Sequence, residues 1–126
     1  MKEVMAIIRM NRINQTKRAL VEAGISSMHA KECLGRGKGL VDLAMLKGVE
    51  HGYEEAISLL GNSQRLIPKR MISIIVSDKL VKKTVSTILG VNRTGKSGDG
   101  KIFVMPIADS VRIRTGEAGD DTLDEA

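Results

Sequence analysis

One pattern occurs twice in this chain and constrains its fold more than any other feature: an apolar strand-like run, an amphipathic helix, then a second strand. In the first copy, the continuous apolar run at residues 4–8 predicts a strand covered on both faces. Asn11 can cap a helix over residues 12–23, which Gly24 ends, and residues 29–34 predict the next strand.

The second copy follows after residue 66. Residues 71–76 are rich in β-branched side chains and predict a third strand, and Ser77 or Asp78 can cap a helix that continues to about residue 89. Residues 102–107 predict a fourth strand and residues 111–114 a short fifth. Two such copies predict an α+β fold of the ferredoxin-like double βαβ kind.

The interval between the copies, residues 36–66, carries no clear core element. It starts in the flexible, basic segment 35–39, and only residues 49–60 have the apolar spacing of a short helix. Such long excursions in a compact domain are either functional or disordered. This one mixes charged and apolar residues, which favours a partner-binding loop. We therefore predict one domain over residues 1–114 that contains the loop, and an acidic tail over residues 115–126.

The charge is distributed unevenly. The net charge is +5, but residues 1–114 hold all 20 basic residues and only 10 of the 15 acidic ones, so this part carries +10. A body this basic suits anionic partners, such as phosphorylated small molecules, acidic proteins or nucleic acid. Tyr53 and Phe103 are the only aromatic residues, which disfavours proteins that stack bases. We expect no nucleic-acid partner.

Other features of the composition exclude further classes. No apolar run approaches the roughly 20 residues of a membrane span, so no stable membrane insertion is expected. Cys33 is the only cysteine, which excludes an internal disulfide and suits a cytoplasmic location. Two histidines, His29 and His51, are too few for a histidine-built metal site, and no metal ligands are predicted.

Residues 90–97 match the phosphate-binding pattern G-x-x-x-x-G-K-[ST] letter for letter. That motif works only between a strand and a helix, whereas here a helix precedes it and a strand follows. This order of the flanking elements argues against a nucleotide hydrolase, which stays a remote alternative. The glycines Gly95, Gly98 and Gly100 still suit a loop whose backbone N–H groups contact phosphate, and Lys96 and Lys101 add positive charge.

Arg112 and Arg114 lie two residues apart in the expected fifth strand, so both side chains would point to one face. Two guanidinium groups on one face can form a bidentate clamp for an anion. A solvated arginine face beside an ordinary loop explains the same residues, and the spacing leaves both interpretations open.

Together these segments resemble the PII (GlnB-like) nitrogen-signalling family. The resemblance rests on the sequences TGKSGDGKIF at residues 94–103 and VRIRTGE at residues 111–117. AIIR at residues 6–9, ALVEAGI at residues 19–25 and IPK at residues 67–69 agree with it. It covers nearly the whole chain except the central loop. It implies a non-enzymatic sensor that forms a compact trimer of identical or paralogous subunits, or a larger mixed assembly.

The resemblance also implies ligand sites in clefts between subunits. ATP or ADP would be bound by glycines and side chains of the two signatures and of the loop base: Gly35, Gly37, Lys38, Thr94, Gly95, Gly98, Asp99, Gly100, Lys101, Arg112 and Arg114. The effector 2-oxoglutarate would be bound by Lys69, with Gly37 and Lys38. Magnesium would accompany ATP.

Departures from the family pattern concern the loop. Gly39 stands where typical members have a glutamine that positions Mg²⁺ and 2-oxoglutarate, and glycine has no side chain to bind either. His51 stands where many members carry a modified tyrosine, so no uridylylation is expected, and Tyr53 lies two residues further on. The lengthened loop resembles the nitrogen-fixation-linked archaeal branch, in particular the second member of its pair, whose target is nitrogenase. A regulator of an ammonium channel or of glutamine synthetase is the alternative.

Overall fold

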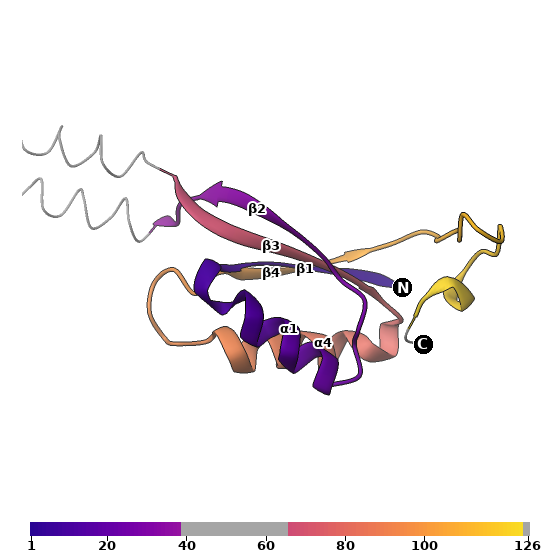
Figure 1. The fold of residues 1–126 in the computed structure, drawn as a ribbon, viewed down its shortest axis with the longest axis horizontal. Coiled ribbons are helices and arrows are strands. Elements are labelled where there is room, and N and C mark those ends of the chain that lie inside the picture. The colour runs from indigo at the N-terminus through magenta and orange to yellow at the C-terminus, as the bar shows by residue number, and fades with distance from the viewer. Residues whose placement is uncertain (39–65, 125–126) are drawn as a thin grey trace, which may run out of the picture.

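The structure is a computed structural model that describes residues 1–38 and 66–124. One four-stranded antiparallel sheet, in the order β2-β3-β1-β4, carries both long helices on the same face (Figure 1). This arrangement confirms the predicted α+β, ferredoxin-like fold. The elements are β1 (Lys2–Arg9), α1 (Ile13–Glu22), β2 (His29–Gly35), β3 (Ile67–Val76), α4 (Val81–Asn92) and β4 (Lys101–Pro106). No helix in these two ranges is long and apolar enough to cross a membrane.

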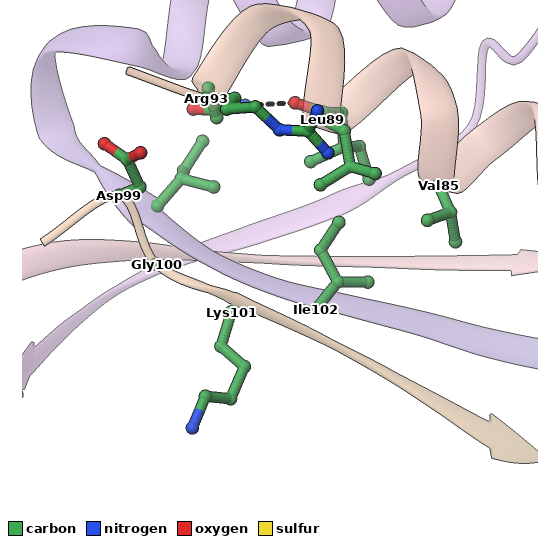
Figure 2. A pocket seen from close by; sticks show the side chains of 10 residues that line it. Val85, Leu89, Arg93, Asp99, Gly100, Lys101 and Ile102 are labelled. Carbon is green, nitrogen blue, oxygen red and sulfur yellow. Dashed lines mark hydrogen bonds between the residues drawn. The ribbon is translucent and has the colours of Figure 1, made fainter. Parts of the chain in front are cut away.

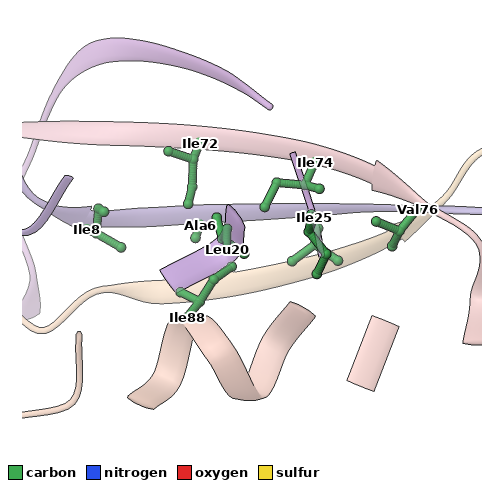
Figure 3. Close-up of a cluster of buried hydrophobic side chains, with 9 residues drawn as sticks. Ala6, Ile8, Leu20, Ile25, Ile72, Ile74, Val76 and Ile88 are labelled. Atoms are coloured by element: carbon green, nitrogen blue, oxygen red, sulfur yellow. The ribbon is translucent and has the colours of Figure 1, made fainter. Parts of the chain in front are cut away.

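The core lies between the sheet and the two helices (Figure 3). In the two central strands, alternate residues point toward the helices, because successive side chains of a strand point to opposite faces. Ile72 and Ile74 of β3 meet Leu20 of α1 and Ile88 of α4, and each of the four is at most 1% exposed. Burial of one such side chain stabilises the fold by about 1.5–3 kcal/mol.

Within residues 1–38 and 66–124, no helix covers the other face of the sheet, so in a single chain residues 4–8 are covered on one face and not on both as predicted. Met5 and Ile7 of β1, Met71 and Ile75 of β3, and Phe103 of β4 alternate with the core residues and are half-buried or exposed. Phe103 is opposite Met5 in the β1–β4 register. We call these five residues the open apolar face. It explains why the β1 sequence is continuously apolar although only one face is buried.

The helix starts differ from the prediction. Asn11 and Asp78 lie inside short 3-10 turns, Met10–Arg12 and Asp78–Leu80, and no side chain caps either α-helix. Each helix instead has a buried threonine hydroxyl that bonds back to the preceding turn: Thr16 to the Arg12 carbonyl at 2.7 Å and Thr84 to the Leu80 carbonyl at 2.8 Å. These buried bonds replace exposed caps as the polar link between each turn and its helix.

The predicted fifth strand at residues 111–114 was wrong. Val111 makes only an isolated bridge to Ala118, and residues 113–115 form a turn between them. We call residues 109–124 the C-terminal hook. Its turn is closed by hydrogen bonds from Arg112 N to the Glu117 carbonyl (2.8 Å) and from Gly116 N to the Arg112 carbonyl (2.7 Å). The hook lies at the end of the sheet away from the loop between α4 and β4 (Figure 1).

Candidate functional site

A cavity of about 320 Å³ opens where β2 ends and β3 and β4 begin. Six predicted site residues line it, from three segments far apart in the sequence, together with Ile7, Arg36 and Phe103: Gly35, Gly37, Lys69, Gly98, Gly100 and Lys101. Both expected sets of binding residues, those for the nucleotide and those for 2-oxoglutarate, therefore contribute to one cavity. Lys69 belongs to the second set alone, Gly37 to both, and the remaining four to the first.

Residues 93–100 form the loop on one side of this cavity, which we call the glycine loop. It leaves the end of α4 and leads into β4, which is the helix-then-strand order that argued against a hydrolase motif. Gly98 and Gly100 have φ angles of 98° and 106°. A Cβ atom on Gly100 would lie 1.8 Å from the Ile7 carbonyl oxygen, so only glycine lets the loop approach β1 this closely.

Asp99 holds the glycine loop in shape. Its Oδ2 accepts hydrogen bonds from the backbone N–H groups of Thr94 (2.8 Å) and Gly95 (3.0 Å). Its Oδ1 accepts from the Thr94 hydroxyl and forms an ion pair with Arg9 of β1. The bonds from Thr94, followed by those from Arg9 and Gly95, keep the pKa of the Asp99 carboxyl well below its usual range. Asp99 is therefore an anion with its acceptor positions occupied.

Two cations attach the glycine loop to the sheet. The Arg9 guanidinium donates to the Ser97 carbonyl at 3.0 Å, and the Lys69 ammonium donates to the Gly98 carbonyl at 3.1 Å. Arg9 and Lys69 are directly opposite each other in the β1–β3 register. Like charges in that position repel each other, and the loop carbonyls and the Asp99 carboxylate stabilise both.

Sequence reasoning did not assign Arg9 to the site. Arg9 ends the AIIR segment that agrees with the family resemblance, but only the antiparallel register places it beside Lys69. The ionic partner Asp99 is 90 residues away in the sequence. A like-charged pair expected across two neighbouring strands is the signal that could have found it.

Lys101 and Ile102, the first two residues of β4, point to opposite sides of the strand (Figure 2). Ile102 points toward α4 and lines a second cavity of about 390 Å³ with Val85, Leu89 and Arg93. The Lys101 side chain extends away from the helices. It therefore brings its ammonium to the face of the sheet that carries the open apolar face.

Other predicted residues lie elsewhere. Thr94 and Gly95 help to build the glycine loop but do not line the first cavity, and neither does Lys38. Gly39, His51 and Tyr53 lie outside the described residues, as does most of the predicted partner-binding loop.

The arginine pair is not in the cavity. Arg112 donates to the Glu117 carboxylate at 3.0 Å and to the Asp121 carbonyl at 3.1 Å, all within the C-terminal hook. Arg114 follows in the exposed turn beside Ile113, which is fully exposed. Strand β4 separates the hook from the glycine loop, and its six residues span about 20 Å. The shared strand face predicted for the two arginines is absent, and one chain cannot bring them to its own cavity.

The cavity has the chemistry of an anion site. Lys69, Lys101 and Arg36 line it, and Arg9 lies behind the glycine loop. Among residues 1–38 and 66–124, no group of three or more histidine, cysteine, aspartate or glutamate residues could hold a metal ion. Asp99 lies in the chain between the lining residues Gly98 and Gly100, but its carboxylate already accepts four hydrogen bonds or ionic contacts.

Comparisons with known proteins give a consistent result. The sequence profile of the family described as "Nitrogen regulatory protein P-II" matches residues 1–117. The chain is 47% identical to "Nitrogen fixation nifHD region GlnB-like protein 2" of Methanobacterium ivanovii, over 98% of this chain and 99% of that protein. It is 36% identical to "Nitrogen regulatory protein P-II" of Rhodobacter capsulatus, over 98% and 100%. Among solved structures, Arabidopsis thaliana PII bound to citrate matches with a TM-score of 0.70 and 30% identity, over 95% of this chain and 86% of that chain.

Proposed function

Because the chain belongs to the P-II family of nitrogen regulatory proteins, we propose that it senses ATP or ADP together with 2-oxoglutarate and inhibits nitrogenase in response. Proteins of this family are regulatory rather than enzymatic, so the chain is a regulatory protein and the hydrolase alternative is set aside. We take it to act in the cytoplasm. The cationic cavity at the glycine loop is the observation that carries the proposal.

The cavity supports the binding of phosphate and carboxylate groups. Lys101 and the backbone of Gly98 and Gly100 line the cavity and would face the phosphates of a nucleotide, because glycines at positive φ leave their N–H groups accessible. Lys69 lines the same cavity, where its ammonium would bind a carboxylate of 2-oxoglutarate. Gly37 also lines the cavity, and Lys38, the next residue in the chain, would contribute from the base of the long loop. The Arabidopsis PII structure has citrate, a polycarboxylate, as its bound ligand.

The distance between the glycine loop and the arginine pair supports a site shared by two subunits. Arg112 and Arg114 would complete the phosphate site of a neighbouring copy from its open side. The open apolar face supports the same conclusion, because a large apolar surface on a small domain is a common association surface. We therefore propose a trimer, formed by identical subunits or together with a paralogous subunit.

Magnesium would enter this site with ATP. The described residues fit it poorly as a protein-held ion, because the acceptor positions of Asp99 are occupied. Gly39, outside the described residues, has no side chain to offer. Phosphate oxygens and water would supply most of the ligands, as is common for Mg²⁺. The ion would neutralise part of the triphosphate charge, and the lysines would bind the remainder.

The target is proposed from the relatives. Several relatives, at 42–47% identity, bear names that place them in a nitrogen-fixation nifHD region. We propose that nitrogenase is the partner and that residues 36–66, the long loop, make the contact. The alternative, regulation of an ammonium channel or glutamine synthetase, requires the same ligand site and a different loop partner.

Two experiments test ligand binding and target inhibition separately. Calorimetric titration of the purified protein with ATP and Mg²⁺ should show binding that 2-oxoglutarate tightens, alone or with the paralogous subunit. Deletion of residues 41–57 should preserve nucleotide binding and abolish inhibition of nitrogenase. Inhibition that survives the deletion would contradict the loop assignment, and absence of nucleotide binding in every assembly would contradict the sensor. Retention of an ammonium channel or glutamine synthetase on the immobilised protein, without nitrogenase, would favour the alternative.

A further inference from the structure

The glycine loop owes its shape to one side chain. The two oxygens of Asp99 accept from Thr94 N, Gly95 N, the Thr94 hydroxyl and Arg9 Nη1. A carboxylate offers about four acceptor positions, so these contacts use all of them. No oxygen of Asp99 remains for a ribose hydroxyl or a metal ion.

The contacts close the loop at both of its ends. Asp99 is bonded to Thr94, at the start of the loop, and the following residue, Gly100, packs against Ile7 of β1. Arg9, the last residue of β1, bonds to Asp99 and to the Ser97 carbonyl. The loop is therefore tied to the central strand by charge-assisted hydrogen bonds, which are about twice as strong as neutral ones.

The same contacts orient the backbone. The carbonyl of Ser97 and the N–H of Gly98 belong to one planar peptide unit and point in opposite directions. Because Arg9 holds the Ser97 carbonyl, the Gly98 N–H points away from Arg9, and Gly98 itself lines the cavity. Among the described residues, no hydrogen bond is made by the N–H groups of Gly98 and Gly100.

We infer that Asp99, with Arg9 and Thr94, is a positioning group: its carboxylate preorganises the glycine loop for phosphate and does not itself contact the nucleotide. This inference rests on the proposed nucleotide site and changes the role that the family resemblance implied for Asp99 and Thr94. Occupied acceptors also keep the negative charge of Asp99 paired with Arg9, so that it repels incoming phosphate less. A loop fixed before binding loses less conformational entropy when the ligand arrives.

The first test uses the nucleotide-free trimer or mixed assembly. Asp99→Asn keeps the size of the side chain but replaces one acceptor oxygen by an NH₂ donor. We expect amide hydrogen exchange at Thr94 and Gly95 to become at least about tenfold faster, while exchange in β1 and β3 is unchanged. Thr94→Val should have a smaller effect of the same kind, and Thr94→Ser, which keeps the hydroxyl, should restore wild-type exchange.

The second test is calorimetric titration of the same variants with ATP and with ADP. Loss of one charged contact should weaken both nucleotides by about 10- to 100-fold for Asp99→Asn, with Thr94→Ser close to wild type. Weaker binding with unchanged loop exchange would show a direct ligand contact and overturn the inference, and so would unchanged binding with a loosened loop. If the wild type binds no nucleotide, the proposed function fails, whereas the exchange experiment still decides whether Asp99 holds the loop. Thr94→Val serves the same purpose if Asp99→Asn does not fold.

Discussion

The glycine loop and the C-terminal hook carry the two parts of the family signature, and they are stabilised in different ways. The glycine loop is tied to the sheet by Arg9, Lys69 and the close approach of Gly100 to Ile7. The hook is closed mainly on itself, through Arg112 and Glu117, and leaves Ile113 fully exposed. In the proposed trimer, the chain would therefore supply the glycine loop to its own site and the arginine pair of the hook to the site of a neighbour.

The substitution with the largest expected effect is one that breaks the attachment of the glycine loop to the sheet. Gly100→Ala places a Cβ atom 1.8 Å from the Ile7 carbonyl oxygen at a φ of 106°. We expect a loss of at least about 2 kcal/mol in the free energy of unfolding and loss of nucleotide binding. Urea denaturation and calorimetry measure these two quantities.

Gly95→Ala is the matched control for that substitution. Gly95 also has a positive φ, of 82°, but no heavy atom lies within 4 Å of the position that a Cβ atom would take there. Only the backbone strain remains, so the expected loss is about 1–2 kcal/mol at most. Equal losses in the two variants would show that the contact with β1 contributes nothing.

The second prediction tests whether the two halves come from different subunits. Lys101→Ala and Arg114→Ala should each weaken ATP binding by about tenfold or more, because each removes a charged contact to phosphate. Refolding the two variants together should restore wild-type affinity at about a quarter of the sites, by random mixing of subunits. A mixture that binds no better than either variant would mean that both groups act within one chain.

The third prediction concerns the pH dependence of the glycine loop. The pKa of Asp99 is lower in the folded protein than its ordinary value, so ionised Asp99 stabilises the fold. This stabilisation is complete above about pH 5, one unit above the ordinary pKa of aspartate, and is lost as the pH falls toward the lower folded value. The difference in unfolding free energy between the wild type and Asp99→Asn should therefore shrink between about pH 5 and pH 2. A difference that stays constant would contradict this assignment.

The smallest effect is expected in the hook. Glu117→Gln removes the exposed ion pair with Arg112, and such pairs contribute less than about 1 kcal/mol. The free energy of unfolding should change by less than that amount, and the backbone bonds of the turn should persist. A loss as large as that of Gly100→Ala would show that the hook, like the glycine loop, depends on a charged contact.

Much of the fold could be predicted from the sequence. The alternation and length of the apolar runs were enough to place all four strands and both helices, since those patterns reflect which side chains face the core. The caps at Asn11 and Ser77 or Asp78 were wrong because buried threonine bonds made exposed caps unnecessary. The fifth strand was wrong because residues 111–114 have no neighbouring strand within the described chain except one bridge partner.

The sequence by itself determined the family, singled out the glycine and lysine residues proposed for the site, and determined the order in which helix and strand flank the glycine loop. These properties are local, because they depend on residues close together in the chain. The tertiary structure decided that Arg9 lies beside Lys69 and bonds to the glycine loop, and that the Asp99 carboxylate bonds within its own loop. It also decided that the hook, which carries the arginine pair, lies at the end of the sheet away from the glycine loop. Those relations depend on strand register and on contacts across as many as 90 residues, which no local pattern encodes.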